Sequence, residues 1–182
     1  MVLGENAASG PTRGTGLRAR QSGEDALIKY RRKLPHWRLR GATYFVTWRL
    51  HQLQLRLTPE ERSLVVSALR YFDGMRFTLI AFVVMDDHVH VVVQPMEEHR
   101  LEMIVHSWKS FTARSLQRQF GRKGRVWQDE YFDRIVRNDA ELLATVEYVA
   151  HNPSERWPEL TAYPWLGFQT WEAGTEARPT EK

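Results

Sequence analysis

Two strand-like runs that lie only two residues apart constrain the fold of this chain most strongly. Residues 77–85 and 88–94 are rich in β-branched and aromatic side chains, and only Asp86-Asp87 separate them. A connection this short joins two strands as an antiparallel hairpin. Any fold for the chain must therefore contain this hairpin.

The other strand and helix patterns are arranged around the hairpin in a regular order. A strand is predicted at 42–50. Thr58 and Glu61 form a capping-box pattern around Pro59, which predicts a helix to about residue 72. After the hairpin, apolar residues recur at helical spacing over 101–120, and a short strand is predicted at 132–136.

A last helix is predicted from Asn138, which forms a second capping-box pattern with Glu141. We expect it to end near Asn152, because Pro153 disfavours helical geometry in the residue before it. The whole order predicts an α+β fold with a ferredoxin-like antiparallel sheet. Helices would cover one face, the extra C-terminal helix would follow, and the other sheet face would be free for a ligand.

Composition limits the setting of the chain. Its 182 residues suffice for one domain, predicted at 27–170 between a disordered basic arm (1–26) and a flexible tail (171–182). The absence of cysteine excludes disulfides and thiolate metal sites and favours a cytoplasmic location. No apolar run approaches the roughly 20 residues that cross a membrane. A net charge of +4 and a pI near 9.6 favour a polyanionic partner.

His88-Val89-His90 is a candidate metal-binding pattern. Alternate residues of a strand share a face, so both imidazoles point the same way, while Val89, Val91 and Val93 point to the opposite, helix-covered face. Imidazoles on residues roughly 7 Å apart along a strand can converge on one divalent ion. Taken alone, the pattern also fits two ordinary strand histidines.

Tyr148 and Asn152 form the second candidate pattern, one turn apart on the last helix. A helical projection gathers the apolar residues Leu142, Leu143, Val146, Val149 and Ala150 in one stripe, with Tyr148 almost opposite. A tyrosine in the core would lie on the stripe, so a surface or functional role is favoured. Asn152 also fits a structural role near a helix C-terminus.

Together these four residues have the parts that attack on a phosphodiester requires. Two imidazoles and an amide oxygen can hold Mg²⁺ or Mn²⁺ with positions open for phosphate oxygens, although the same ligands would tolerate Zn²⁺. The phenol of Tyr148 can act as the nucleophile. The sequence thus predicts a metal-dependent site that acts on a nucleic acid.

The residues resemble the single-tyrosine HUH transposases, and within them the REP-associated tyrosine transposases. The likeness covers about 29–168. It rests on 32–37 (RKLPHW), 41–47 (GATYFVT), 84–90 (VMDDHVH), 108–110 (WKS), 126–133 (VWQDEYFD), 147–153 (EYVAHNP) and 163–165 (YPW). The resemblance implies that His88, His90 and Asn152 bind the metal and that Tyr148 forms a 5′-phosphotyrosine with single-stranded hairpin DNA.

The chain departs from this family at two places. Asp87 stands where relatives often have asparagine, and 154–158 (SERWP) replaces a basic-Ala-Gly type of stretch. The carboxylate of Asp87 could alter metal affinity or cap the turn, and the second change bears on hairpin contacts. Family members occur both as monomers and as homodimers that exchange helices, so either state is open for this chain.

Other residues have weaker functional interpretations. Tyr131 is a rival nucleophile for which packing is favoured, and Asp133 could orient the site or brace an arginine. Trp48, Trp127 and Trp165 could stack on bases, although core packing is favoured for each. Residues that could contact phosphates are Lys109, Arg114, Arg118, Arg122, Lys123 and Arg125. A protein that binds hairpin DNA or RNA without cutting it is the alternative function.

Overall fold

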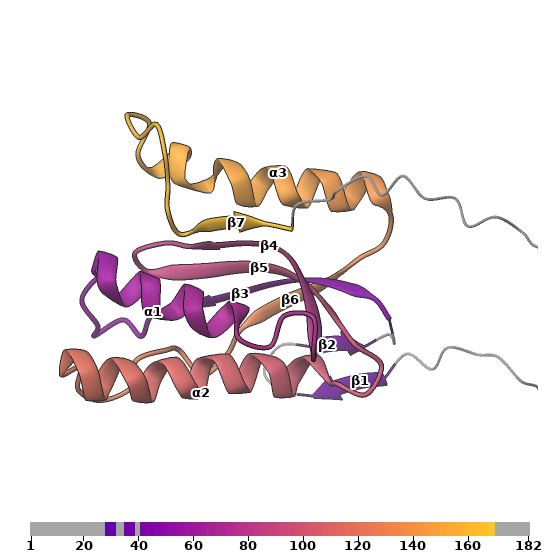
Figure 1. The fold of residues 1–182 in the computed structure, drawn as a ribbon. Coiled ribbons are helices and arrows are strands. Elements are labelled where there is room, and N and C mark those ends of the chain that lie inside the picture. The colour runs from indigo at the N-terminus through magenta and orange to yellow at the C-terminus, as the bar shows by residue number, and fades with distance from the viewer. Residues whose placement is uncertain (1–27, 32–34, 39–40, 170–182) are drawn as a thin grey trace, which may run out of the picture.

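The computed structural model describes residues 28–31, 35–38 and 41–169, which form a three-layered α+β structure (Figure 1). Its centre is a five-stranded antiparallel sheet of order β6-β3-β5-β4-β7. Helices α1 and α2 lie on one side of this sheet and α3 lies on the other. The strands of the sheet are β3 (Thr43–Arg49), β4 (Phe77–Val84), β5 (His88–Pro95), β6 (Phe132–Val136) and β7 (Leu166–Phe168), and the helices are α1 (Pro59–Arg70), α2 (Leu101–Phe120) and α3 (Asp139–Arg156).

The predicted hairpin and the ferredoxin-like strand order are both confirmed. β4 and β5 pair around Asp86-Asp87, and β5 lies between β4 and β3 with antiparallel pairing to each. Without β7, the order β6-β3-β5-β4 is that of two interlocked strand-helix-strand units. This order places β5 at the centre of the sheet.

Helices α1 and α2 follow their sequence signals closely. The Thr58 side chain accepts a hydrogen bond from the Glu61 backbone, and the Glu61 carboxylate accepts one from the Thr58 backbone. Gly121, with φ of 70°, ends α2 in the left-handed conformation that glycine adopts at little cost. Both helices bury their apolar faces against the sheet in one large core that includes Val89, Val91 and Val93.

Helix α3 corrects two expectations. It covers the sheet face that we expected to be free, where Val149 packs in a second core with Phe45, Val83 and Val92. It also runs to Arg156 instead of ending near Asn152. Pro153 removes only one helical hydrogen bond close to the C-terminus, its ring is buried, and the Trp157 N–H donates to the Pro153 carbonyl at 2.8 Å.

Three short strands were not predicted from the sequence. β1 (Ile28–Arg31) and β2 (Pro35–Arg38) form a separate antiparallel pair, and β7 extends the sheet beyond β4. Gly167 of β7 pairs with Phe82, where an added Cβ would lie 2.4 Å from a ring carbon. The predicted arm (1–26) and tail (171–182) lie outside the described residues. Within the described residues, no helix combines the length and apolar character needed to cross a bilayer.

Candidate active site between the sheet and the third helix

The two histidines of β5 project together toward α3. Their ring centroids are 4.6 Å apart, and the three valines that alternate with them lie in the core on the opposite face. The alternation expected for a strand is therefore confirmed. His90 is buried, whereas the His88 side chain is partly accessible.

Nδ1 of each imidazole has a hydrogen-bonding partner. Nδ1 of His88 lies 2.6 Å from a carboxylate oxygen of Asp87, and Nδ1 of His90 lies 2.7 Å from the hydroxyl of Thr47. Thr47 is the direct cross-strand neighbour of His90 on β3. Partners of this kind hold a ring in one orientation and one tautomer, which leaves Nε2 free to bind a metal.

Burial and nearby charges keep the imidazole of His90 neutral. Burial lowers the pKa of His90 to about 3, with further lowering by the charges of His88 and Arg49 and a smaller opposite effect of Asp87. Burial raises the pKa of the Asp87 carboxyl, but His88 and Arg56 outweigh this, so that it lies below its ordinary value. At neutral pH the site thus has a neutral His90 beside an ionised Asp87.

Tyr148 and Asn152 of α3 face the histidines. The Asn152 Oδ1 lies 3.3 Å from Nε2 of His88, and the Tyr148 ring centroid lies 5.3 Å from that of His90. Asn152 is buried, while Tyr148 is 46% exposed. The structure therefore brings all four predicted residues together, with the phenol at the open side of the group.

The predicted position of Tyr148 opposite the inward face of α3 is wrong in detail. The fully buried residues of α3 are Thr145, Val149, Asn152 and Pro153, so its inward face includes two polar residues. Leu142 and Val146 of the predicted stripe pack beside them, while Leu143 is 66% exposed. Tyr148 lies three residues after Thr145 and four before Asn152, which places it along the edge of this face. The edge position explains how the ring reaches His90 and still contacts solvent.

Phe45 and Arg134 support the tyrosine and were missed from the sequence. The Phe45 ring stacks on His90 at 5.3 Å and meets the Tyr148 ring edge-on at 5.9 Å. The guanidinium of Arg134 lies over the Phe45 ring, 5.3 Å from its centroid, and donates to the Thr145 hydroxyl and the Glu141 carboxylate. β6 is thereby linked to α3 beside the site. Only the sheet register, which no local pattern reveals, brings these side chains together.

The donor set fits a divalent ion held by nitrogen and oxygen. Two imidazoles and one amide oxygen converge from β5 and α3, and each imidazole has the second partner typical of metal-binding histidines. Among the described residues there is no group of three His, Cys, Asp or Glu side chains that could hold a metal. An ion at this site would therefore depend on the Asn152 amide as its third protein ligand.

Tyr131 and Asp133 lie on the other side of the sheet from this group. Tyr131 is buried in the core beneath α1 and α2, as expected for a packing residue. Asp133 pairs with Val46, whose side chain belongs to that same core, so it does not face the histidines. Core packing is likewise confirmed for Trp48 and Trp127, which are 1% and 4% exposed.

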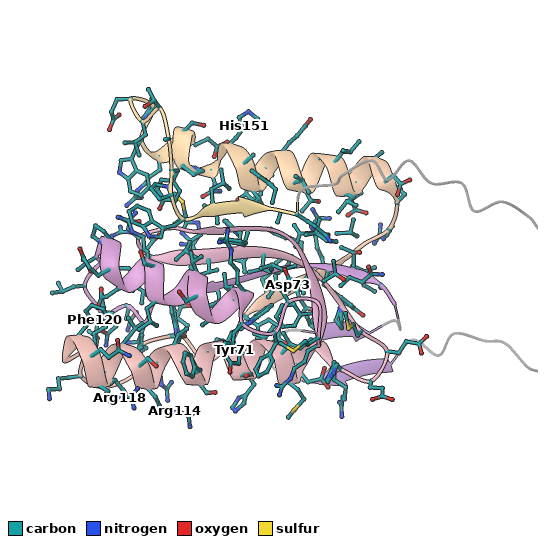
Figure 2. The ribbon with its side chains drawn as sticks, viewed as in Figure 1. Tyr71, Asp73, Arg114, Arg118, Phe120 and His151 are labelled. Atoms are coloured by element: carbon teal, nitrogen blue, oxygen red, sulfur yellow. The ribbon has the colours of Figure 1, made fainter. Side chains whose placement is uncertain are left out.

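The predicted phosphate-binding residues separate into two groups. Arg122 is not available for DNA, because its five N–H groups bind the Glu61 carboxylate, Gln54 and the carbonyls of 55 and 56. Lys109 donates to the carbonyls of 128 and 129, and Arg125 forms an ion pair with Asp129. Of the exposed remainder, Arg114 and Arg118 lie within α2 on its outer side, away from α3 (Figure 2), and Lys123 follows the helix.

Comparison with known proteins identifies the family. The profile described as "Transposase IS200 like" matches residues 53–152, which is more than half of the chain and includes both histidines, Tyr148 and Asn152. The chain belongs to the IS200-like transposase family. No curated protein matches it.

One solved structure supports the fold of this transposase. A REP-associated tyrosine transposase bound to a REP hairpin superposes with a TM-score of 0.61 at 21% identity, over 77% of this chain and 82% of that one. A candidate transposase from Deinococcus radiodurans R1 matches with a TM-score of 0.41 at 18% identity, over 72% of this chain and 97% of that one. At 21% identity, the likeness to the first of these structures concerns the fold alone.

Proposed function

We propose that this IS200-like transposase cuts and rejoins hairpin-bearing single-stranded DNA through a covalent bond to Tyr148. The observation that carries the proposal is the convergence of four side chains. Nε2 of His88 lies 3.3 Å from Oδ1 of Asn152, and the Tyr148 ring packs against His90. The family assignment supports a reaction on DNA.

The residues of the chain have distinct roles in this reaction. The phenolic oxygen of Tyr148 attacks the phosphorus, forming a P–O bond to the protein as the P–O3′ bond breaks. The phenolic proton leaves and the departing 3′-oxygen takes up a proton. A free 3′-hydroxyl can reverse the step, so that strands are rejoined without an external energy source.

His88, His90 and Asn152 are the ligands proposed for Mg²⁺ or Mn²⁺. Bound there, the ion would polarise the scissile phosphate and offset its developing negative charge. Thr47 and Asp87 contact Nδ1 of the two rings, which would leave each Nε2 available to the ion. The exposed side of Tyr148 gives a DNA strand access to the phenol.

A hairpin substrate is proposed from the solved relative that is bound to a REP hairpin. The likeness in fold covers 77% of this chain and 82% of that one, which supports a similar placement of DNA here. All four site residues come from one chain, so both a monomer and a homodimer are compatible with this proposal.

The test is covalent capture on a denaturing gel. A labelled hairpin oligonucleotide is incubated with the protein and Mn²⁺, with and without a chelator. We expect a protein–DNA adduct with the wild type and with Tyr71→Phe, a control tyrosine that is 70% exposed on the side of α1 and α2 (Figure 2). Tyr148→Phe should bind the hairpin and form no adduct.

Two outcomes would contradict the proposal. An adduct that persists in Tyr148→Phe would assign the nucleophile to another residue, with Tyr131→Phe as the next variant. Hairpin DNA that is bound but uncut by the wild type, with Mn²⁺ and without it, would favour the non-catalytic binding protein.

A further inference from the structure

A small polar hollow adjoins the proposed active site at the end of β3. It has a volume of about 240 Å³, and its lining includes Arg49, Gln52, Arg56, Asp87 and Gln128. Pockets for whole small-molecule ligands usually measure roughly 300–1,000 Å³. The hollow is therefore sized for a part of a larger substrate. Asp87, which holds His88, forms its boundary with the site.

Arg49 lies on the same sheet face as the two histidines. It pairs directly with His88 across β3 and β5, as Thr47 does with His90, and residues paired in this way share a face. Trp48, which lies between Thr47 and Arg49 in β3, is buried on the opposite face against Trp108 of α2. The Arg49 guanidinium is thus positioned at the rim of the site by the strand itself.

The hydrogen-bonding groups of this hollow are available to a ligand. Among the described residues, the side chains of Arg49, Gln52 and Gln128 form no hydrogen bond or ion pair, and Arg49 is exposed. The negative charge nearby is already compensated, because Arg56 pairs with Asp86 and Asp87. A guanidinium and two amides beside a neutralised carboxylate favour an anion with several acceptor oxygens.

We propose that Arg49 and this hollow bind a backbone phosphate of the DNA strand next to the scissile phosphate. The inference rests on the proposed function, because it takes the position of the scissile phosphate from the four-residue site. In this inference the DNA strand passes the end of β3, while α3 supplies the nucleophile. Arg49 contacts the substrate in this scheme, and Gln52 and Gln128 complete the phosphate contacts.

The experiment pairs a protein change with a change in a single phosphate. Arg49→Gln and Arg49→Lys are compared with Arg70→Gln, an exposed arginine at the end of α1, on the side of the sheet opposite α3 (Figure 1). Each protein cleaves a series of hairpins in which one phosphate near the cut is replaced by neutral methylphosphonate. Single-turnover cleavage rates, hairpin affinities and melting temperatures are measured for every combination.

We expect Arg49→Gln to lose about 10- to 100-fold in cleavage rate or hairpin affinity, the range for a charge-assisted hydrogen bond. Arg49→Lys should recover part of the loss, and Arg70→Gln should behave as the wild type. One methylphosphonate should slow the wild type by a similar factor and have little further effect on Arg49→Gln, since both changes remove the same contact. Melting temperatures should not change.

Two results would overturn the inference while leaving the proposed function intact. In the first, Arg49→Gln forms the adduct at the wild-type rate. In the second, Arg49→Gln is slower but remains as sensitive as the wild type to every methylphosphonate, which would mean that Arg49 acts other than by binding a phosphate. An absence of any adduct with the wild type would instead contradict the proposed function.

Discussion

Replacing Thr47 by valine tests whether the hydrogen bond behind His90 prepares the site for a metal ion. The two side chains have nearly the same shape, so the change removes the hydroxyl that lies 2.7 Å from Nδ1 of His90 and little else. His90 is 4% exposed, so water cannot easily replace the lost partner. For Nε2 to bind an ion, Nδ1 must carry the proton and donate it to this hydroxyl.

The expected cost follows from this geometry. A buried donor without a partner costs about 1–3 kcal/mol. Loss of such a supporting hydrogen bond typically reduces metal affinity by roughly 10- to 100-fold, which corresponds to about 1.4–2.7 kcal/mol. The two ranges overlap, so we expect Mn²⁺ affinity to fall by about that factor.

Isothermal titration with Mn²⁺ measures this directly, with urea unfolding as the second readout. Thr112→Val is the matched control, because the buried Thr112 hydroxyl accepts a hydrogen bond from Trp127 on the other side of the sheet. The control should lose about 1–3 kcal/mol of stability and keep its Mn²⁺ affinity. If Thr47→Val binds Mn²⁺ as the wild type does, the hydroxyl does not hold the ligand and the reasoning fails.

Two further predictions concern other parts of the chain. Glu61→Gln should lower the free energy of unfolding at neutral pH by about 3 kcal/mol, measured in urea, because it leaves the Arg122 guanidinium buried without its carboxylate partner. Burial raises the pKa of Glu61, but Arg122 and the Thr58 amide outweigh this and lower the pKa below its ordinary value. The ion pair therefore stabilises the wild type above that ordinary value, and this stabilisation is lost as the pH falls through the lowered pKa. The urea midpoint of the wild type should fall on acidification more steeply than that of the variant, and equal slopes would contradict the assignment. Asp87→Asn should weaken Mn²⁺ binding less than Thr47→Val, since the amide oxygen can still accept from Nδ1 of His88; a larger loss in the titration would show that the charge of Asp87 matters most.

Local patterns predicted the elements of the fold well. The hairpin around Asp86-Asp87 and the caps at Thr58 and Asn138 depend on residues within a few positions of one another, and the structure shows each of them. The alternation of His88 and His90 with the valines also follows from strand geometry alone. These features needed no knowledge of distant contacts.

Features that depend on distant contacts could not be predicted in the same way. A projection based on apolar residues excludes Thr145 and Asn152 from the inward face of α3. Both lie on that face because Thr145 accepts a hydrogen bond from Arg134 and the Asn152 side chain contacts that of His88. The sequence around Arg122 suggests a surface cation, because its ion-pair partner Glu61 lies 61 residues earlier in the chain.

The roles of Thr47 and Arg49 depend on the register between β3 and β5. Alternation along β3 could have placed both residues on one face, but only the pairing with β5 puts them opposite His90 and His88. A shift of one residue would have turned them to the other face. The sequence alone therefore could not distinguish them from other strand residues.

The most direct test of the account is the position of Mn²⁺ relative to residue 148 and the DNA. Crystals of Tyr148→Phe with Mn²⁺ and an uncut hairpin allow the ion to be located by its anomalous scattering. We expect one peak at coordination distance, roughly 2–2.5 Å, from Nε2 of His88, Nε2 of His90 and Oδ1 of Asn152, on a phosphate that the residue 148 ring also faces. An ion bound elsewhere, or a phosphate on that ion beyond the reach of residue 148, would contradict the account.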